Sequence, residues 1–366
     1  MSSSPHLAIL IVGAGPTGLT AALELARRGI VPRIVDRKEG PTPLSKAVGI
    51  SSHSLDILGP SKVAERLLAD GIRISRAHFY AQDRELGIVD FSVLPHRYNF
   101  LLSLPQRDTE TIMADVLAGL GVKVEWHTEL EGVSETGDKA KARLKTAGGE
   151  EREADFDFVF AADGADSTVR KAMGIDFAGY AHKRLWSIAD AEIADWPYEP
   201  KTAQAFLHRN GDVGFIIPIG KNRFRAVSNT EDALARVPGD YRISKLLRTD
   251  RFHIPVRQAV SYQTDRVFLG GDAAHVHSPL GARGMNLGIE DAASFARRLV
   301  EGDLAGYEAE RRPVGRRWIT LSERILSMAQ SDSSLVQPLR NFVLSIIGHI
   351  PLLQRPILDR VAGLKE

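Results

Sequence analysis

Two glycine-rich segments of the chain have the residue types that bind a phosphorylated nucleotide. The first reads Gly-Ala-Gly-Pro-Thr-Gly from Gly13 to Gly18, and the second reads Gly-Asp-Ala-Ala-His from Gly271 to His275. Glycines let a backbone approach phosphate oxygens closely, and a helix that begins there offers unpaired N–H groups to the negative charge. The aspartate of the second segment can accept hydrogen bonds from sugar hydroxyls. Two distant segments of this kind indicate one large cofactor that is held at both ends.

The first segment has the flanking elements that such a site needs. Residues 7–12 form an apolar run typical of a buried parallel strand, and apolar residues recur at helical spacing from Leu19 to Ala26. A second apolar run, 31–35, ends at Asp36, where a carboxylate should meet a ribose hydroxyl. A tight turn without a ligand is the alternative, but strand, helix, strand and acid in this order favour nucleotide binding. The candidate cofactor-binding residues here are Gly13, Gly15, Pro16, Thr17, Gly18, Asp36 and Arg37.

The second segment follows another strand pattern. Residues 266–270 lead to Asp272, which we therefore place at the carboxyl end of a strand, where ligands bind in parallel sheets. A glycine-rich stretch opens a helix from about Met285 to Val300, whose first N–H groups would stabilise a negative ligand. An ordinary helix N-cap is the alternative role for Asp272. The candidate residues of this segment are Asp272, Pro279, Gly281, Gly284, Met285 and Asn286.

A third segment, from Ala161 to Arg170, reads Ala-Ala-Asp-Gly-Ala-Asp-Ser-Thr-Val-Arg. With the other two segments, it makes the chain resemble the single-component aromatic hydroxylases, the FAD-dependent monooxygenases related to p-hydroxybenzoate hydroxylase and polyketide hydroxylases. The order and spacing of the three motifs match this family across residues 7–300, and their joint occurrence is far more specific than any one of them. We expect no thioredoxin-like C-terminal domain of the kind that relatives with polyketide substrates often carry.

The resemblance implies roles for individual residues. Asp272 would bind the ribityl chain of FAD, and the helix after Gly284 would stabilise the reduced flavin ring. Asp163 would lie near the pyrophosphate and orient neighbouring groups, because a carboxylate and a phosphate repel each other. Gln106, with Glu110 four residues later, would contact FAD.

Several polar residues have alternative interpretations. Lys46 is a candidate for cofactor binding, but it and His53 stand where many relatives have arginine, whose planar fork neither side chain can imitate. Arg37 suits either a solvated loop or the 2′-phosphate of NADPH. His275 and His277 could suggest a metal site, but no cysteine or carboxylate framework accompanies them, so we predict a structural or flavin-adjacent role and no metal.

The function implied by the resemblance is hydroxylation of an aromatic or polycyclic small molecule. FAD would be bound without a covalent link, NADPH or NADH would bind transiently to reduce it, and O₂ would form a flavin C4a-hydroperoxide. No side chain stands out as a nucleophile or base, so the catalytic residues are not predicted. Two alternatives stay open: a flavin-dependent reductase or dehydrogenase of the geranylgeranyl-reductase type, and a non-catalytic flavin-fold binding protein. Neither the substrate nor the choice between NADH and NADPH follows from the sequence.

The expected fold is α/β with an α+β insertion, in which a Rossmann-like FAD-binding domain is interleaved with a β-sheet substrate domain and followed by a helical tail. The expected divisions are 1–75, 101–175 and 263–300 for the FAD-binding domain, 76–100 and 176–262 for the substrate domain, and 301–366 for the helical C-terminal segment. Candidates for the wall of the substrate cavity are Trp186, Phe206, Phe215 and Tyr262. Aromatic residues on strands more often belong to a core.

The composition of the chain limits which binding partners and which cellular compartment we expect. A formal net charge of +1 over 366 residues gives no reason to expect nucleic acid, and the absence of cysteine excludes disulfides and thiolate metal sites. The chain shows no signal peptide and no apolar run that approaches the ~20 residues of a membrane span. We therefore expect a cytoplasmic monomer or homodimer.

The tail carries two apolar stripes at helical spacing. The first consists of Leu339, Phe342, Val343, Ile346, Ile347 and Ile350, and the second consists of Ile357, Leu358, Val361 and Leu364. Basic residues lie nearby, so a helix on a membrane surface is one interpretation. We prefer the interpretation that both stripes close the gap between the two domains, because amphipathic helices usually pack on their own core, and we expect no membrane contact.

Overall fold

The computed structural model describes residues 7–43, 47–82 and 84–365. Its centre is a five-stranded parallel sheet in the order β18-β12-β1-β2-β8. The run Ile-Leu-Ile-Val makes β1 the central strand, and all four of its residues are buried. The strands of this sheet are β1 (Ile9–Val12), β2 (Arg33–Asp36), β8 (Val124–Trp126), β12 (Phe158–Ala161) and β18 (Val267–Leu269). The predicted Rossmann-like sheet is confirmed.

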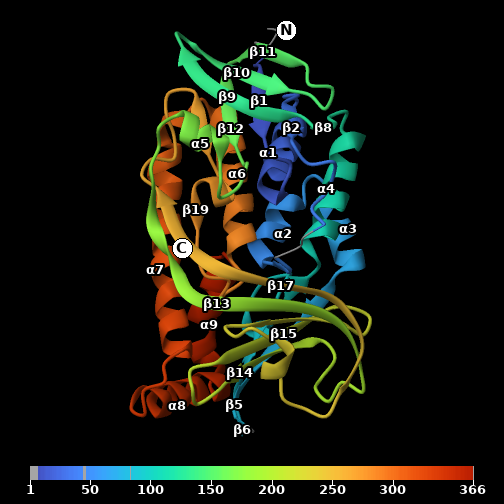
Figure 1. Cartoon of the computed structure of the whole chain (residues 1–366), viewed down its shortest axis with the longest axis vertical. Helices are drawn as coiled ribbons and strands as arrows, with labels where there is room; N and C mark the ends of the chain where they lie inside the picture. The colour runs from blue at the N-terminus through green and yellow to red at the C-terminus, as the bar shows by residue number, and fades with distance from the viewer. Residues whose placement is uncertain (1–6, 44–46, 83, 366) are drawn as a thin grey trace.

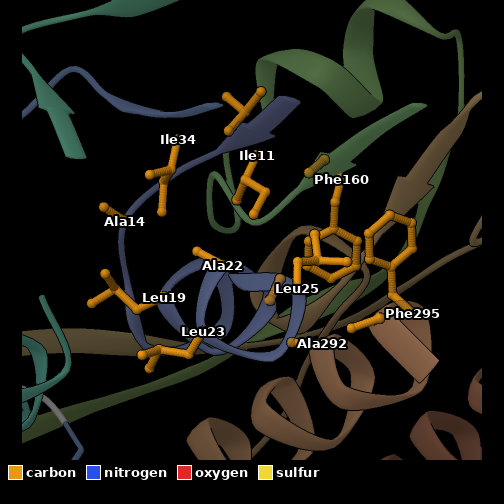
Figure 2. Close-up of a cluster of buried hydrophobic side chains, with 14 of the residues drawn as sticks. Ile11, Ala14, Leu19, Ala22, Leu23, Leu25, Ile34, Phe160, Ala292 and Phe295 are labelled. Atoms are coloured by element: carbon orange, nitrogen blue, oxygen red, sulfur yellow. The ribbon is translucent and has the colours of Figure 1, made fainter. Parts of the chain in front are cut away.

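Helices pack on one face of this sheet and a smaller sheet packs on the other. Figure 2 shows α1 beneath the strands, with Phe160 of β12 stacked on Phe295 of α6 at a centroid distance of 4.6 Å. The α1 helix starts at Pro16, where a fixed φ favours a first turn, and α6 ends before Gly302 in the left-handed conformation. The elements of these layers are α1 (Pro16–Ala26), α4 (Gln106–Gly119), α6 (Gly284–Glu301), β9 (Glu129–Thr136), β10 (Lys139–Lys145) and β11 (Glu151–Phe156).

A second, eight-stranded sheet lies at the other end of the molecule (Figure 1). Its strand order is β19-β17-β13-β16-β15-β14-β5-β6. Two strands of 18 residues each, β13 and β17, reach from this sheet back to the half that contains the parallel sheet, so they hold the two halves together. The strands are β5 (Arg76–Ala81), β6 (Arg84–Asp90), β13 (Phe177–Ala194), β14 (Thr202–Leu207), β15 (Val213–Gly220), β16 (Arg223–Ser228), β17 (Arg242–Ala259) and β19 (His275–Val276).

Short elements link the two halves. A three-stranded sheet, β3-β7-β4, contacts the larger sheet where Ser103 Oγ donates to the carbonyl of Pro218 at 2.6 Å. The elements of this region are β3 (Gly49–Ile50), α2 (Ser52–Leu58), α3 (Val63–Asp70), β4 (Ile72–Ile74), the 3-10 turn η1 (Phe91–Val93) and β7 (Leu101–Ser103). The remaining ones are α5 (Thr168–Ala172), η2 (Leu234–Arg236), η3 (Gly271–Ala273) and η4 (Leu304–Gly306).

The tail consists of α7 (Tyr307–Ala329), α8 (Val336–His349) and α9 (Pro351–Val361). Part of the second apolar stripe packs on the body, because Leu358 joins a buried cluster with Phe91 and Leu94, although Ile357 stays exposed. The first stripe does not. Leu339 and Phe342 are exposed, and α8 uses its other side to contact β6. The prediction that both stripes close the gap between the domains is therefore wrong for α8, since a helical period shows that one face is apolar but not what covers it.

Candidate functional site

Three loops meet at one edge of the parallel sheet. Gly13 follows β1, Asp163 follows β12 and Gly271 follows β18, and these three strands are adjacent and parallel in the order β18-β12-β1. Their carboxyl ends therefore lie side by side, at the edge where ligands bind in sheets of this type. Each of the three sequence motifs supplies one of these loops.

The glycines of the first loop have different physical roles. A side chain at Gly13 would collide with the carbonyl of Ala162, and one at Gly18 would collide with the carbonyl of Gly13. Gly13 also has a φ of +98°, which L side chains rarely adopt. At Gly15, by contrast, a β carbon would meet nothing closer than Glu110 Oε1 at 3.9 Å. The packing of the protein requires Gly13 and Gly18, whereas Gly15 leaves room beside the first turn of α1 that protein atoms do not fill.

Thr17 joins the two glycine-rich segments that are distant in sequence. A β carbon at Gly271 or at Gly288 would collide with Thr17 Oγ1. Thr17 lies in the first turn of α1, Gly271 begins η3 and Gly288 lies in the first half of α6. The loops predicted to hold the two ends of one cofactor are thus packed against each other.

Asp36 fixes the first loop from the neighbouring strand. Its Oδ2 accepts from Ala14 N at 2.7 Å and its Oδ1 accepts from Lys38 N at 2.9 Å. The carboxylate is nearly buried at the end of β2, in the position from which a ribose would be reached. Arg37 points away from the loop, and its Nη1 lies 3.7 Å from Glu129 Oε1 at the surface.

Gln106 and Glu110 come from the first turns of α4. Gln106 Nε2 donates to Glu110 Oε1 at 2.8 Å, and Glu110 Oε2 accepts from Thr42 N at 2.6 Å. Burial raises the pKa of Glu110. Because Glu110 is also the nearest group to the open side of Gly15, this pair borders the space beside the glycine loop.

Lys46 and His53 are the two positions that depart from the pattern of the similar family. Lys46 lies outside the described residues. His53 lies in α2, and its backbone N–H donates to the carbonyl of Ala362 at 3.1 Å. A β carbon at Gly363 would come within 3.0 Å of His53 Cβ, so this histidine packs against the end of the tail.

Asp163 and Arg170 occupy buried positions in the third loop. Asp163 Oδ2 accepts from Val169 N at 3.2 Å, while Oδ1 is buried and has no hydrogen-bond partner among the described residues. Burial raises the pKa of this carboxyl. Arg170 donates to the carbonyls of Ala273 at 2.9 Å and Ala165 at 2.8 Å. The side chain of Arg170 therefore ties the third loop to the Asp272 loop and is not solvated.

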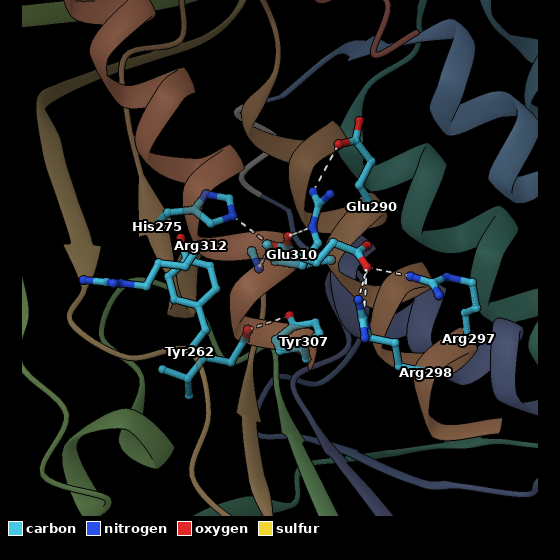
Figure 3. Close-up of polar contacts among 12 residues, drawn as sticks. Tyr262, His275, Glu290, Arg297, Arg298, Tyr307, Glu310 and Arg312 are labelled. Carbon is cyan, nitrogen blue, oxygen red and sulfur yellow. Dashed lines mark hydrogen bonds and ion pairs between the residues drawn. The ribbon is translucent and has the colours of Figure 1, made fainter. Parts of the chain in front are cut away.

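The Asp272 loop is held from behind by a buried charged network (Figure 3). Asp291 of α6 accepts from Gly271 N at 3.0 Å, from His275 Nε2 at 2.7 Å and from Arg311 Nε at 2.8 Å. Burial alone would raise the pKa of Asp291, but the charges of His275 and Arg311 hold it below its ordinary value. Asp272 itself is exposed in η3, next to Gly271. The network thus fixes the backbone that presents Asp272.

The same network extends toward the start of α6. Arg311 Nη2 also donates to Glu290 Oε2 at 3.2 Å, and Glu290 Oε1 accepts from Arg283 Nη2 at 2.6 Å. The guanidinium of Arg283 lies over the Trp318 ring at 5.0 Å from its centroid. His275 accordingly has the structural role predicted for it, bonded to a buried carboxylate. No cluster of three metal-ligating side chains occurs in the part of the chain that the structure describes.

The loop from Pro279 to Gly284 leads into α6. Asn286 is fully buried, and its amide donates to the carbonyls of Gly49 at 3.0 Å and Ala282 at 2.6 Å while its Oδ1 accepts from Ser51 N. The side chain of Asn286 therefore positions this loop, which leaves the backbone of the first turn to meet a ligand. No side chain caps α6, and a β carbon at Gly284 would meet nothing within 4 Å.

The four aromatic candidates for the cavity wall lie in three different hydrophobic clusters. Trp186 and Phe215 share a cluster with Leu280 of loop 279–284, so they face that loop, which we call the flavin-side loop because the sequence predicts that it borders FAD. Phe206 belongs to the opposite face, which the 3-10 turn η2 covers, and its assignment to the cavity wall is wrong because neighbouring strand residues point in opposite directions. Tyr262 is also wrong, since it lies in the core of the nucleotide-binding half and stacks on His275.

A buried ion pair on this sheet was missed by sequence reasoning. Arg225 Nε and Nη2 donate to the two oxygens of Asp190 at 2.6 and 2.7 Å. The two residues are paired across β13 and β16, two positions from Val227, which belongs to the cluster of the flavin-side loop. They therefore place a charged pair on the same face as Phe215.

These observations fit FAD. The open side of Gly15 suits a pyrophosphate on the first turn of α1. The exposed Asp272 lies on the loop packed against Thr17, and the uncapped first turn of α6 opens beyond it. The Oδ1 of Asp163 is buried without a hydrogen-bond partner in the described residues, and such atoms are found at functional positions.

Comparisons with known proteins agree with this geometry. The sequence profile of the FAD binding domain family matches residues 6–241 and 239–322. A 6-methylpretetramide 4-monooxygenase of Streptomyces rimosus is 32% identical over 96% of this chain and 67% of its own length. A pentachlorophenol 4-monooxygenase of Sphingobium chlorophenolicum is 30% identical over 85% of this chain and 63% of its own length. The chain thus spans about two-thirds of the length of these relatives.

A solved structure gives the fold. The p-nitrophenol 4-monooxygenase of Pseudomonas putida DLL-E4 superimposes with a TM-score of 0.87, covering 98% of this chain and 99% of that chain at 20% identity. The chain belongs to the FAD-binding family of flavoprotein monooxygenases. It is an oxidoreductase whose cofactor is FAD, as the three motifs predicted.

Proposed function

We propose that this protein hydroxylates an aromatic or polycyclic small molecule with O₂ and NAD(P)H. The observation that carries the proposal is the meeting of three loops at the ends of β1, β12 and β18, with the apolar face around Trp186 and Phe215 directed at the flavin-side loop. FAD, when bound, supplies the oxygen and hydride chemistry. The relatives that act on pentachlorophenol and 6-methylpretetramide by their names support a phenolic or polycyclic substrate.

In this proposal the chain's own residues bind and orient. The N–H groups around Gly15 hold the pyrophosphate, Asp36 accepts from the adenosine ribose and Asp272 accepts from the ribityl hydroxyls. The first turn of α6, from Gly284 to Asn286, directs its N–H groups and positive dipole end at the pyrimidine edge of the flavin. The remaining candidates, Gly13, Pro16, Thr17, Gly18, Gln106, Asp163, Pro279, Gly281 and Met285, shape these loops.

The cofactor assignment can be tested without turnover. Replacing Gly15 by Ala puts a methyl group in the space proposed for the pyrophosphate and leaves the fold intact, because the nearest protein atom, Glu110 Oε1, would lie 3.9 Å away and would not clash. We expect the variant to unfold at the wild-type temperature as apoprotein but to bind FAD at least about tenfold more weakly, a loss of about 1.4 kcal/mol. Gly119→Ala is the matched control, since a β carbon there meets nothing within 4 Å. Wild-type FAD affinity in Gly15→Ala would place the pyrophosphate elsewhere.

The reaction is tested with isotopic oxygen. The FAD-loaded enzyme, NAD(P)H and ¹⁸O₂ are combined with phenols and polycyclic ketones, and products are analysed by mass spectrometry. Hydroxylation places one labelled oxygen in the product. A confirmed substrate that is converted without label would favour the reductase alternative instead.

A further inference from the structure

The outer face of α8 is apolar and open to solvent. Leu335, just before the helix, is 83% exposed, and Leu339 and Phe342 are each 63% exposed. The apolar surface continues at Leu352, which is 80% exposed in the first turn of α9. Together with these four residues, the surface that we call the tail face contains Val336, Val343, Ile350, Leu353 and Ile357. Single exposed apolar side chains are ordinary, but a contiguous set marks an interaction site.

Contacts between the opposite side of the tail and the body of the protein keep the tail face turned toward solvent. A β carbon on Gly348 of α8 would collide with Gly87 of β6, so the two backbones touch. Gln354 of α9 accepts from Asp90 N at 2.8 Å, and Arg340 is buried beneath α8. The tail is therefore docked on the body by one side and presents the other.

The exposed charged residues of α9, beside the tail face, are basic, and the nearest exposed acid on the other side, Asp332, precedes α8. The basic residues of segment 333–365 are Arg340, Arg355, Arg360 and Lys365. The single acidic residue of this segment is Asp359, which is buried and lies 3.0 Å from Lys365 Nζ. Four positive charges and one negative charge leave the segment at +3. Arg355 and Arg360 are exposed, and neither forms an ion pair within the described part of the chain.

A basic hollow adjoins the apolar surface on α9. Its volume is about 280 Å³, and it is lined by Leu352, Arg355, Pro356, Asp359, Arg360 and Lys365. Those in α9 recur every three or four positions, so they share one side of the helix, and Lys365 lies just beyond its end. Leu352 belongs both to the hollow and to the tail face. Apolar side chains and unpaired arginines therefore adjoin, as in helices that lie at the surface of anionic membranes.

We propose that the tail face docks on the surface of an anionic lipid bilayer, with the apolar side chains of α8 in the headgroup region and Arg355 and Arg360 against lipid phosphates. No helix in the described residues is long and apolar enough to cross a membrane, so the contact is a surface one. Figure 1 shows α8 at one end of the molecule, remote from β9–β11, where a planar surface can reach it. Charge complementarity favours lipid over a second copy of the chain, because a symmetric dimer through this face would bring like charges together.

The test uses the full-length, FAD-loaded protein and vesicle co-sedimentation. We expect binding to vesicles of equal parts phosphatidylcholine and phosphatidylglycerol, weak binding to phosphatidylcholine alone, and weaker binding at high salt. The double variant Leu339→Ser/Phe342→Ser should lose at least about tenfold in affinity, because two large apolar side chains no longer enter the interface. The double variant Arg355→Gln/Arg360→Gln should lose about tenfold or more, and only on the anionic vesicles.

Matched controls keep the test decisive. Leu246→Ser/Leu247→Ser alters exposed apolar residues of β17, and Arg316→Gln/Arg317→Gln alters exposed arginines of α7, so both should bind vesicles like the wild type. Wild-type protein that stays in the supernatant with both vesicles would overturn the proposal. So would equal losses in the control variants. A lipid-free dimer, measured by light scattering, that Leu339→Ser/Phe342→Ser converts to monomer would assign the face to a second copy.

Discussion

Asp291 and Asp163 are both buried carboxylates beside the cofactor loops, yet their surroundings are opposite. Asp291 is surrounded by donors, with one oxygen shared by Gly271 N and His275 and the other bonded to Arg311. Asp163 accepts from Val169 N and from other groups of its own loop, whereas its Oδ1 has no hydrogen-bond partner in the described residues. The pKa of Asp291 is held low by its charged neighbours, whereas burial raises the pKa of Asp163.

This difference separates a structural charge from a functional one. Removing one member of a buried charged network leaves its partners uncompensated, so the negative charge of Asp291 stabilises the fold. The charge of Asp163 destabilises the fold, because the cost of its desolvation outweighs the hydrogen bonds that the carboxylate accepts from its own loop. A destabilising charge that the chain keeps beside Gly13 indicates a role with the cofactors, as its motif predicts.

The largest expected effect comes from removing the structural charge. Asp291→Ala should lower the free energy of unfolding by about 3–5 kcal/mol, because Arg311 and His275 would stay buried without their partner. It should also release FAD, since the Gly271 backbone loses its acceptor. Urea unfolding and the visible absorbance after gel filtration measure both effects.

The control for this variant is an acid of the same helix. Glu301→Ala removes a half-exposed carboxylate that pairs with Arg297 at 2.8 Å. An exposed pair of this kind contributes about 0.5 kcal/mol or less. If Asp291→Ala were no less stable than Glu301→Ala, the buried network would have no structural role.

A smaller effect of opposite sign is expected at Asp163. Asp163→Asn keeps an acceptor for Val169 N but removes the desolvated charge, so the apoprotein should gain about 1 kcal/mol. Reduction of the bound FAD by NAD(P)H, followed by stopped-flow absorbance, should slow in the same variant. Asp166→Asn, at a carboxylate that is 94% exposed, should change neither quantity. An Asp163→Asn apoprotein that is less stable than wild type would contradict the assignment of a destabilising charge.

The smallest effect concerns pH. The folded-state pKa of Asp163 lies above the ordinary 3.8, so its destabilising charge is present above that raised pKa and disappears as the pH falls through it toward 3.8. The advantage of Asp163→Asn, about 2 °C in melting temperature, should disappear over this window. The folded-state pKa of Asp291 lies below 3.8, so its stabilisation is complete above 3.8 and is lost only at lower pH. A pH-independent advantage of Asp163→Asn would show that its charge is not the cause.

Much of the nucleotide-binding half follows from the sequence, because its signals are local. An apolar run predicts β1, the glycines predict the turn after it, and the strand pattern before Gly271 predicts β18. The predicted helix from Met285 to Val300 is α6, Gly284–Glu301. These elements are specified by neighbouring residues, so a single chain suffices to find them.

Orientation is what the sequence could not provide. Phe206 and Phe215 look alike in strands, but only the assembled sheet decides which one faces the flavin-side loop. The stripe of α8 predicts a helix with an apolar face, but not that the face is exposed. The bond between Asp291 and Arg311 joins two helices through charged residues that, in sequence, resemble a solvated surface. Long-range packing decides each of these cases.

The helix α7 connects the network behind the cofactor loops to the eight-stranded sheet. Near the start of the helix, Arg311 donates to Asp291, the carboxylate that holds the Asp272 loop. Near its end, Leu326 belongs to the cluster beneath the eight-stranded sheet. We therefore expect FAD binding to stabilise α7 along its length, because its two ends contact the network behind the cofactor loop and the cluster under the eight-stranded sheet. Saturating FAD should slow amide hydrogen exchange not only in the loops that bind it but also along residues 307–329. Exchange at the C-terminal end of α7 would then report whether FAD is bound near its N-terminal end.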